Sequence, residues 1–256
     1  MENSFKVEKI AITGANSYVG INLIKECIKK KITVHAYCRN PEELSKKIDN
    51  YDYLKTFKYK LDDNFIFNFE KIDAVIHLAH ERISQPRFKF KSDPNIIGTQ
   101  NLIDQASKFN LKNIIYLSSH LAHSKTLSQY GKSKFNCEKY FNDKNHVIVK
   151  SGIVFGGEPL GFYKLLIKNL KNSKIMPIIF PNAPVYPIHV NDLCKILLHL
   201  ADPHKRTKNT YYVGLSHPTK LRDFFYRLSV KNFNKKIKFF PLPGNLIYFI
   251  SLITGY

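Results

Sequence analysis

Tyr130 and Lys134 are separated by four positions in the stretch Tyr-Gly-Lys-Ser-Lys. On a helix, residues i and i+4 lie on one face, so the lysine ammonium can approach the tyrosine ring and stabilise its phenolate. A neighbouring positive charge lowers the pKa of a phenol from its ordinary value of about 10. Such a phenol can exchange a proton with a carbinol while a hydride moves to or from nicotinamide. The pair therefore predicts the acid–base centre of a redox enzyme.

A glycine-bearing turn about a hundred residues earlier has the composition of a dinucleotide-binding loop. Residues 13–20 read Thr-Gly-Ala-Asn-Ser-Tyr-Val-Gly, between an apolar strand and an amphipathic helix. Gly14 allows the tight turn, Gly20 allows the helix to pack on the strand, and the first amides of the helix meet a pyrophosphate. Ser17 stands where a middle glycine is usual, and its hydroxyl is expected to bind a phosphate. The predicted cofactor contacts here are Gly14, Asn16, Ser17, Tyr18, Val19 and Gly20; the alternative is a plain turn without a ligand.

The end of the second strand bears on the choice of cofactor. Enzymes that prefer NAD place an acid there against the ribose 2′-hydroxyl, whereas this chain has Cys38 followed by Arg39. A guanidinium suits a 2′-phosphate, and the sequence shows no acid opposing it, so we expect NADP in preference to NAD. The alternative is an exposed arginine that stacks on adenine and suits either cofactor.

Strand and helix periods alternate through the first 150 residues, which predicts an α/β fold of the Rossmann type with a doubly wound parallel sheet. Ligands bind such sheets at the carboxyl ends of the strands. The expected strands are 9–13, 33–38, 55–61, 74–78, 113–117 and 146–149, and the expected helices are 19–30, 41–48, 95–109 and 129–141.

The pattern changes after residue 156. Helices are expected at 163–170, 190–200 and 220–229, with extended segments at 185–189 and 210–214. We therefore predict a dinucleotide-binding core over residues 1–156 and a small C-terminal substrate lobe over 157–256, interleaved with the last strands.

The chain of 256 residues carries a formal net charge of +20. Residues 151–256 contain 15 Lys and Arg against four acidic residues, a difference of +11. Such a field attracts anions, among which a sugar diphosphate, a nucleic acid and an acidic membrane are the candidates. No nucleic-acid recognition motif accompanies the charge, so no specific nucleic-acid partner is expected.

The cysteines are scattered, and the N-terminal residues lack the apolar stretch of a signal peptide, so we expect a cytoplasmic protein with reduced thiols. The apolar segment 246–253 is too short to span a bilayer. We expect it to pack as a terminal helix; weak association with a membrane surface is the alternative.

Further short motifs occur in a characteristic order: Leu61-Asp62, Val75-Ile76-His77-Leu78-Ala79, Asn95-Ile96-Ile97-Gly98-Thr99-Gln100-Asn101-Leu102, Tyr116-Leu117-Ser118-Ser119, 150–156 and 187–193. With these, nearly the whole chain resembles an extended or atypical short-chain dehydrogenase/reductase of the NAD-dependent epimerase/dehydratase family, which modifies nucleotide sugars.

The resemblance implies a role for each matching residue. Ser119 would hydrogen-bond the substrate oxygen, Tyr130 would exchange its proton, and Lys134 would bind the nicotinamide ribose and keep the phenol acidic. Further cofactor contacts are implied for Leu61, Asp62, Leu78 and Ala79. The implied substrate is a nucleotide-activated sugar, the implied setting is polysaccharide synthesis, and a homodimer through the helices at 95 and 129 is common in the family.

Departures from the family pattern narrow this expectation. Lys150-Ser151 replaces the usual Arg-Pro, and only eleven positions separate Ser119 from Tyr130. These changes favour a compact 4-keto-sugar reductase or an epimerase. The alternative is a relative that binds dinucleotide without turnover, as a scaffold or redox sensor.

Two other sets of residues are weaker candidates for binding sites, one for a metal and one for a diphosphate. His77, His80, His120 and His123 come from neighbouring loops, but their spacing matches no standard zinc pattern, so no metal is expected. Lys220, Arg222 and Arg227 are candidate cations for a diphosphate.

Overall fold

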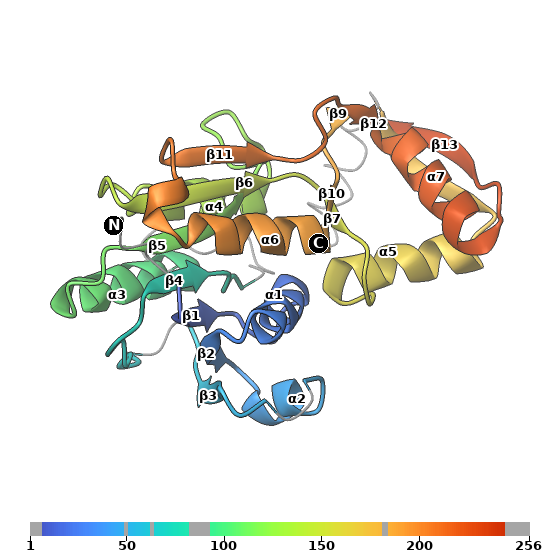
Figure 1. Ribbon diagram of the computed structural model, residues 1–256. Helices are drawn as coiled ribbons and strands as arrows, with labels where there is room; N and C mark the ends of the chain where they lie inside the picture. Colours follow the sequence, from blue (N-terminus) through green and yellow to red (C-terminus); the bar gives the residue numbers. More distant parts are fainter. Residues whose placement is uncertain (1–6, 49–50, 62–63, 82–92, 181–183, 244–256) are drawn as a thin grey trace.

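The central sheet has seven strands that pair in parallel in the order β11-β6-β5-β4-β1-β2-β3 (Figure 1). The predicted doubly wound α/β fold is confirmed. The chain runs from β1 to β2 on one side and from β4 to β5 on the other, so the switch point at which ligands bind such sheets lies between β1 and β4. The strands are β1 (Lys9–Thr13), β2 (Thr33–Cys38), β3 (Leu54–Lys58), β4 (Ala74–His77), β5 (Ile114–Ser119), β6 (His146–Ser151) and β11 (Thr210–Val213).

The computed structural model describes residues 7–48, 51–61, 64–81, 93–180 and 184–243, except the side chains of residues 179 and 180. The predicted cofactor contact Asp62 and the apolar segment 246–253 lie outside the described residues.

Helices cover both faces of the sheet because its strands are apolar on both sides. Ile10 and Ile12 pack towards α1 (Tyr18–Lys29) and α6 (Val190–Leu200), while Ala11 between them packs towards α3 (Pro94–Lys108) and α4 (Gln129–Glu138). This alternation follows from the two-residue period of a strand. The short helix α2 (Pro41–Ser45) follows β2.

Two predicted helices end three residues earlier than expected. The prediction for α4 extended to residue 141, but Tyr140 N and Phe141 N donate to carbonyls three residues back, so the chain leaves the α-helix in a tighter turn after Glu138. The helix predicted over residues 41–48 closes as α2 at Ser45.

A lobe lies to one side of the sheet and has its own apolar cluster (Figure 1). It contains α5 (Gly161–Asn172), α7 (Leu221–Phe233) and the parallel pair β8 (Ile175–Phe180) and β13 (Lys238–Pro243). Neither β8 nor β13 was predicted. Pro177, Pro241 and Pro243 interrupt a strand pattern, and such prolines are tolerated here because the two strands form a separate two-stranded sheet.

The chain crosses between the lobe and the sheet more than once. The pair β7 (Val154–Phe155) and β10 (Ile188–His189) leads into α6, the pair β9 (Pro184–Val185) and β12 (Thr219–Lys220) leads into α7, and a 3₁₀ turn (Pro203–Lys205) precedes β11. Because β11 pairs with β6, the C-terminal part of the chain supplies an edge strand of the sheet. A domain boundary at residue 156 stays a prediction.

Gly98 allows α3 to approach the segment that follows β3. A Cβ at this position would lie 2.3 Å from the Leu61 carbonyl oxygen, which is backbone and cannot rotate away. We expect Gly98→Ala to lower the free energy of unfolding by about 1–3 kcal/mol, the usual cost of overpacking, despite the better helix propensity of alanine. Denaturant unfolding measures this, with the exposed Ser107→Ala in the same helix as a control expected within about 0.5 kcal/mol of the parent. Unchanged stability of Gly98→Ala would contradict the close approach.

Candidate active site

The turn between β1 and α1 has the geometry that a dinucleotide loop requires. Gly14 has φ +68°, and a Cβ on it would lie 2.7 Å from Ala79 N; a Cβ on Gly20 would lie 2.5 Å from the Gly14 carbonyl oxygen. Only glycine fits either position without a shift of backbone. Ser17 caps α1, since its Oγ accepts a hydrogen bond from Gly20 N at 3.1 Å. The turn therefore fits a pyrophosphate at the start of α1, and the roles of Asn16 and Ser17 as contacts stay predictions.

Tyr18 joins this turn to the lobe. Its hydroxyl donates to the Gly156 carbonyl, and its ring stacks on Tyr163 with centroids 5.7 Å apart. Burial, above all, raises the pKa of Tyr18. The Tyr18 side chain therefore contacts the lobe, and the Val19 side chain packs against the core. The predicted cofactor contacts of both residues are left to their main chain.

A buried polar chain links the turn to β4 and α3. Thr13 Oγ1 lies 2.6 Å from His77 Nδ1, and His77 Nε2 lies 3.1 Å from Thr99 Oγ1. Burial and the charge of Lys134 lower the pKa of His77 to about 3, so the ring is neutral. Ala79 N donates to Thr13 Oγ1 at 3.3 Å, which places the predicted contacts Leu78 and Ala79 beside Gly14.

Lys134 lies almost entirely inside the protein, with 3% of its surface exposed. Its ammonium donates to the Leu117 carbonyl at 2.7 Å and lies 4.6 Å from the centre of the Tyr116 ring. Burial lowers the pKa of Lys134 to about 8, and Cys137 and Glu138 oppose that shift. The amine is therefore close to its titration point at neutral pH.

Tyr130 and Ser119 are on the two elements that hold this lysine, α4 and β5. Tyr130 is in the first turn of α4 and is 42% exposed, as a group that meets a substrate must be. Ser119 is the last residue of β5, and its Oγ accepts from Leu121 N at 3.2 Å. A Cβ at Gly131 would lie 2.4 Å from the Leu121 carbonyl, so the start of α4 lies directly against the segment after Ser119.

His80 is a neighbour of Tyr130 that the sequence did not indicate. The two rings meet edge to face with centroids 5.0 Å apart, and His80 Nδ1 is buried with no hydrogen-bond partner among the described residues. Burial lowers the pKa of His80 well below its ordinary value, with Lys134 and His77 adding to the shift. A neutral imidazole therefore packs against the candidate catalytic phenol.

The expectation that no acid opposes Arg39 was wrong. Arg39 Nη1 lies 3.3 Å from Glu81 Oε1. Glu81 is held in place because its amide donates to Asn95 Oδ1 at 2.6 Å and its carbonyl accepts from Asn95 Nδ2 at 3.0 Å. The sequence missed this acid because it lies 42 residues away, in the segment after β4. An acid just beyond that strand's end is the signal that would have indicated it.

Leu61 is buried in the core beside α3, so its predicted cofactor contact is limited to its main chain. The four histidines considered as metal ligands lie in different surroundings: His77 hydrogen-bonds two threonines, His80 packs on Tyr130, His120 contacts the rings of Tyr186 and Tyr212, and His123 is exposed. Within the described ranges, no group of three or more His, Cys, Asp or Glu is placed to hold a metal.

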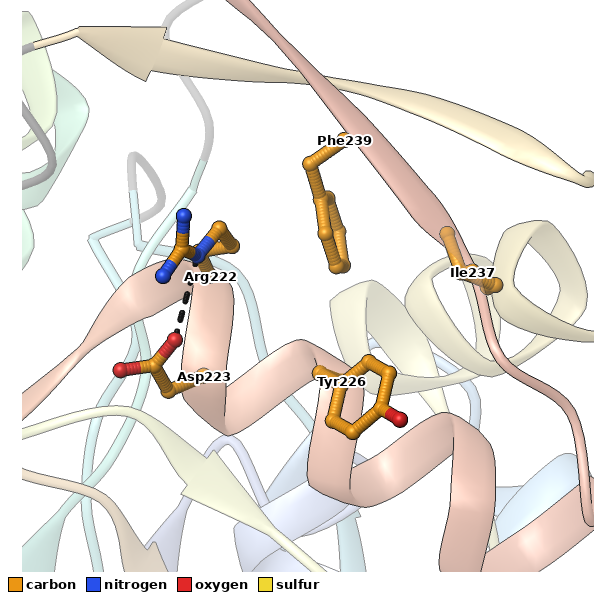
Figure 2. Close-up of a pocket in the computed structure, with 5 residues that line it drawn as sticks. All are labelled: Arg222, Asp223, Tyr226, Ile237 and Phe239. Atoms are coloured by element: carbon orange, nitrogen blue, oxygen red, sulfur yellow. Dashed lines mark hydrogen bonds and ion pairs between the residues drawn. The ribbon is translucent and has the colours of Figure 1, made fainter.

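Arg222 of the predicted diphosphate clamp lines a pocket of about 390 Å³ in the lobe. Figure 2 shows it beside Asp223, with which it pairs at 3.1 Å, while Tyr226, Ile237 and Phe239 complete the lining. Arg227 is five positions further along α7, about 140° around the helix, so it does not face this pocket with Arg222. The structure therefore does not bring the three cations into one clamp.

Comparison with known proteins identifies the family. The family model described as the NAD dependent epimerase/dehydratase family matches residues 10–214, four-fifths of the chain. The chain belongs to this family. A dTDP-D-glucose 4,6-dehydratase of Dictyostelium discoideum is 33% identical over 127 residues, 44% of this chain and 29% of that protein. A bifunctional UDP-glucose 4-epimerase and UDP-xylose 4-epimerase 3 of Arabidopsis thaliana is 25% identical over 53% of this chain and 47% of its own. The match thus spans less than half of these relatives.

Solved structures of other proteins share the fold. The Bordetella bronchiseptica enzyme WbmG, solved in complex with NAD, has a TM-score of 0.76 at 16% identity and covers 95% of this chain and 84% of its own. A UDP-N-acetylglucosamine 4-epimerase from Bacillus cereus has a TM-score of 0.70 at 21% identity, covering 93% and 87%. No helix in the described part of the chain is both long and apolar enough to cross a membrane.

The depressed pKa of Lys134 predicts how stability depends on pH. The unfolded chain holds this proton up to about pH 10.4, whereas the folded protein loses it near pH 8, so in between the unfolded state binds more protons and stability rises with pH. Relative to Lys134→Met, we expect the parent protein to gain up to about 3 kcal/mol of unfolding free energy between pH 7 and pH 10.4. Denaturant titrations of both proteins test this; a difference independent of pH would show that the lysine titrates normally.

Proposed function

We propose that this protein is an NAD(P)-dependent oxidoreductase or epimerase that acts on a nucleotide-activated sugar. The observation that carries the proposal is the buried amine of Lys134, with a pKa of about 8, on the helix that exposes Tyr130 at the carboxyl end of β5. Family membership supports it, since the relatives of this chain include a dTDP-D-glucose 4,6-dehydratase and a UDP-glucose 4-epimerase.

Each member of the candidate trio has a task that its placement allows. Ser119, at the strand end, hydrogen-bonds the sugar oxygen that is oxidised or reduced. Tyr130 transfers the proton of that oxygen, and Lys134 favours the phenolate and binds a ribose hydroxyl. A bound nicotinamide supplies or accepts the hydride. In a 4-keto-sugar reductase the cofactor exchanges at each cycle, whereas an epimerase returns the hydride to its substrate and retains the cofactor.

Arg39 favours NADP, and Glu81 does not exclude it. Both side chains of this ion pair are largely exposed, at 64% and 43%, and exposed pairs contribute about 0–1 kcal/mol. A 2′-phosphate offers a bidentate partner with more charge than the carboxylate. The phosphate therefore displaces Glu81 at small cost, and Glu81 limits the preference for NADP without reversing it.

The first experiment is a titration of the purified protein with NADPH and with NADH, followed by nicotinamide fluorescence. Retained NAD favours the epimerase, and exchange with a preference for NADPH favours the reductase. Binding of a dinucleotide without turnover of any nucleotide sugar would favour a scaffold or redox sensor, and binding of neither would contradict the proposal. A homodimer through α3 and α4 stays a prediction for the same preparation.

Tyr130→Phe removes the proton that the proposed reaction transfers and keeps the ring that packs on His80. We expect turnover to fall by about 10²–10⁴-fold, the usual contribution of a positioned acid–base group, with little change in cofactor affinity. The assay follows nicotinamide absorbance and product sugar with UDP-glucose, UDP-glucuronic acid and dTDP-glucose as probes. Tyr53→Phe, an exposed tyrosine before β3, is the matched control and should keep full activity. Equal turnover of both variants would exclude Tyr130 as the proton donor.

Glu81→Gln removes the carboxylate that competes for Arg39. We expect NADPH to bind up to about fivefold more tightly, the equivalent of about 1 kcal/mol, with NADH affinity unchanged. Arg39→Ala should weaken the binding of NADPH and leave the binding of NADH unchanged. Glu70→Gln makes the same change of charge at another exposed site and controls for the general field. Equal effects of Glu81→Gln and Glu70→Gln on NADPH would show that Arg39 does not contact the 2′-phosphate.

A further inference from the structure

A second buried charged cluster lies beside the candidate catalytic residues. Lys150 Nζ on β6 lies 2.8 Å from Glu138 Oε2 at the end of α4, and the two side chains are only 8% and 9% exposed. Removing both charges from water is costly, and replacing such a pair with apolar residues is often neutral or stabilising. A contribution to stability alone therefore does not explain why this buried ion pair is present. Its hydrogen bonds to neighbouring segments indicate its role.

The remaining hydrogen bonds of the pair reach the segment that carries Ser119. Ser118 Oγ donates to Glu138 Oε1, and Lys150 Nζ donates to the Ala122 carbonyl at 2.7 Å. Ala122 N in turn donates to the Ser119 carbonyl at 2.9 Å. One ion pair thus binds the residue before Ser119 and the residue three positions after it.

The same pair fixes α4. Tyr130, Lys134 and Glu138 follow one another at intervals of four residues on α4, so they lie on one face of the helix. The helix and the strand end therefore share one anchor, and a shift of either changes the separation of Ser119 and Tyr130. Misplacement of reacting groups by about 1 Å can cost about 10²-fold in rate.

The anchor also acts on the charge of Lys134. The groups that face this ammonium are Tyr116 and the Leu117 carbonyl on β5, His77 on β4, His80 after it, and Cys137 and Glu138 on its own helix. Among the titratable ones, Cys137 and Glu138 favour the protonated amine against burial. Loss of the Glu138 charge therefore lowers the pKa of Lys134 further.

We propose that Glu138 and Lys150 are positioning residues that hold Ser119, Tyr130 and Lys134 in a productive arrangement. Lys150, where the family pattern has arginine, thereby serves this anchor, since its ammonium is enclosed by Glu138, Ala122 and the rings of Phe135 and Tyr212. The proposal rests on the proposed function for its catalytic meaning, and it goes beyond it in assigning two residues that do not touch the reacting atoms.

The test compares Lys150→Met, Lys150→Arg, Glu138→Gln and the double variant Lys150→Met/Glu138→Gln in the full chain. We expect Lys150→Met and the double variant to lose at least tenfold in kcat, with dinucleotide affinity within twofold because the β1–α1 turn is not part of the anchor. The double variant should recover the stability that Lys150→Met loses, since no unpaired buried charge remains, without recovering kcat. Lys150→Arg should keep kcat within about threefold. Lys29→Met, which breaks the ion pair with Glu26 on α1, is the control and should leave kcat unchanged.

Two measurements do not depend on turnover and separate this proposal from the proposed function. Amide hydrogen exchange should accelerate in residues 118–122 and 129–138 of the double variant and stay unchanged in β1 and β2. The NMR titration of Lys134 should move to lower pH in Glu138→Gln but not in Lys29→Met. Full kcat in the double variant, or unchanged exchange and an unchanged Lys134 titration, would overturn the proposal. If the parent protein turns over no nucleotide sugar, these two measurements still decide whether the anchor exists.

Discussion

The buried ammonium of Lys134 is the constraint on which the candidate site depends. A lysine with 3% exposure is tolerated only where fixed polar groups replace water, and here they are the Leu117 carbonyl and the face of the Tyr116 ring. Both groups are on β5, so α4 must lie against that strand in one register. This register places Tyr130 at the strand's carboxyl end, next to the segment that begins with Ser119. Burial of one cation therefore both lowers its pKa and aligns the residues that would use it.

A second requirement is close approach of backbone segments around the β1–α1 turn. The absence of a side chain at Gly14 allows the segment after β4 to touch the turn, and its absence at Gly98 allows α3 to touch the Leu61 carbonyl. Between them, His77 bridges Thr13 and Thr99 inside the protein. The turn, β4 and α3 are thus held together by contacts that leave no space for a larger residue. On the other side of β5, the ion pair of Glu138 and Lys150 holds α4 and β6 together.

The sequence was sufficient to predict the central sheet because each of its strands is a local pattern of apolar residues. Apolar runs bounded by turns identified β1 and β2 to the residue, and the motif around residue 190 did the same for α6. The parallel pair β8 and β13 was missed because its strands contain prolines and pair across more than sixty residues, so no local pattern describes them. The residues of the candidate site also divide into those that a local pattern predicts and those that it does not. Residues within a motif, such as Tyr130 and Lys134, were found, whereas Glu81 opposite Arg39 and Glu138 opposite Lys150 become partners only once the chain folds.

Tyr18 shows why the turn and the lobe form one functional unit. The residue is in the first turn of α1, where a pyrophosphate would bind, yet its ring stacks on Tyr163 and its hydroxyl binds Gly156 in the segment that leads into the lobe. Gly156 has φ +92°, and a Cβ there would meet the His189 ring, which also caps α6. The β1–α1 turn is therefore joined to the lobe by stacked aromatic rings and by a glycine whose position leaves no room for a side chain. Because these contacts join the first turn of α1 to the segment that leads into the lobe, they fix the lobe relative to the same turn that would hold the cofactor.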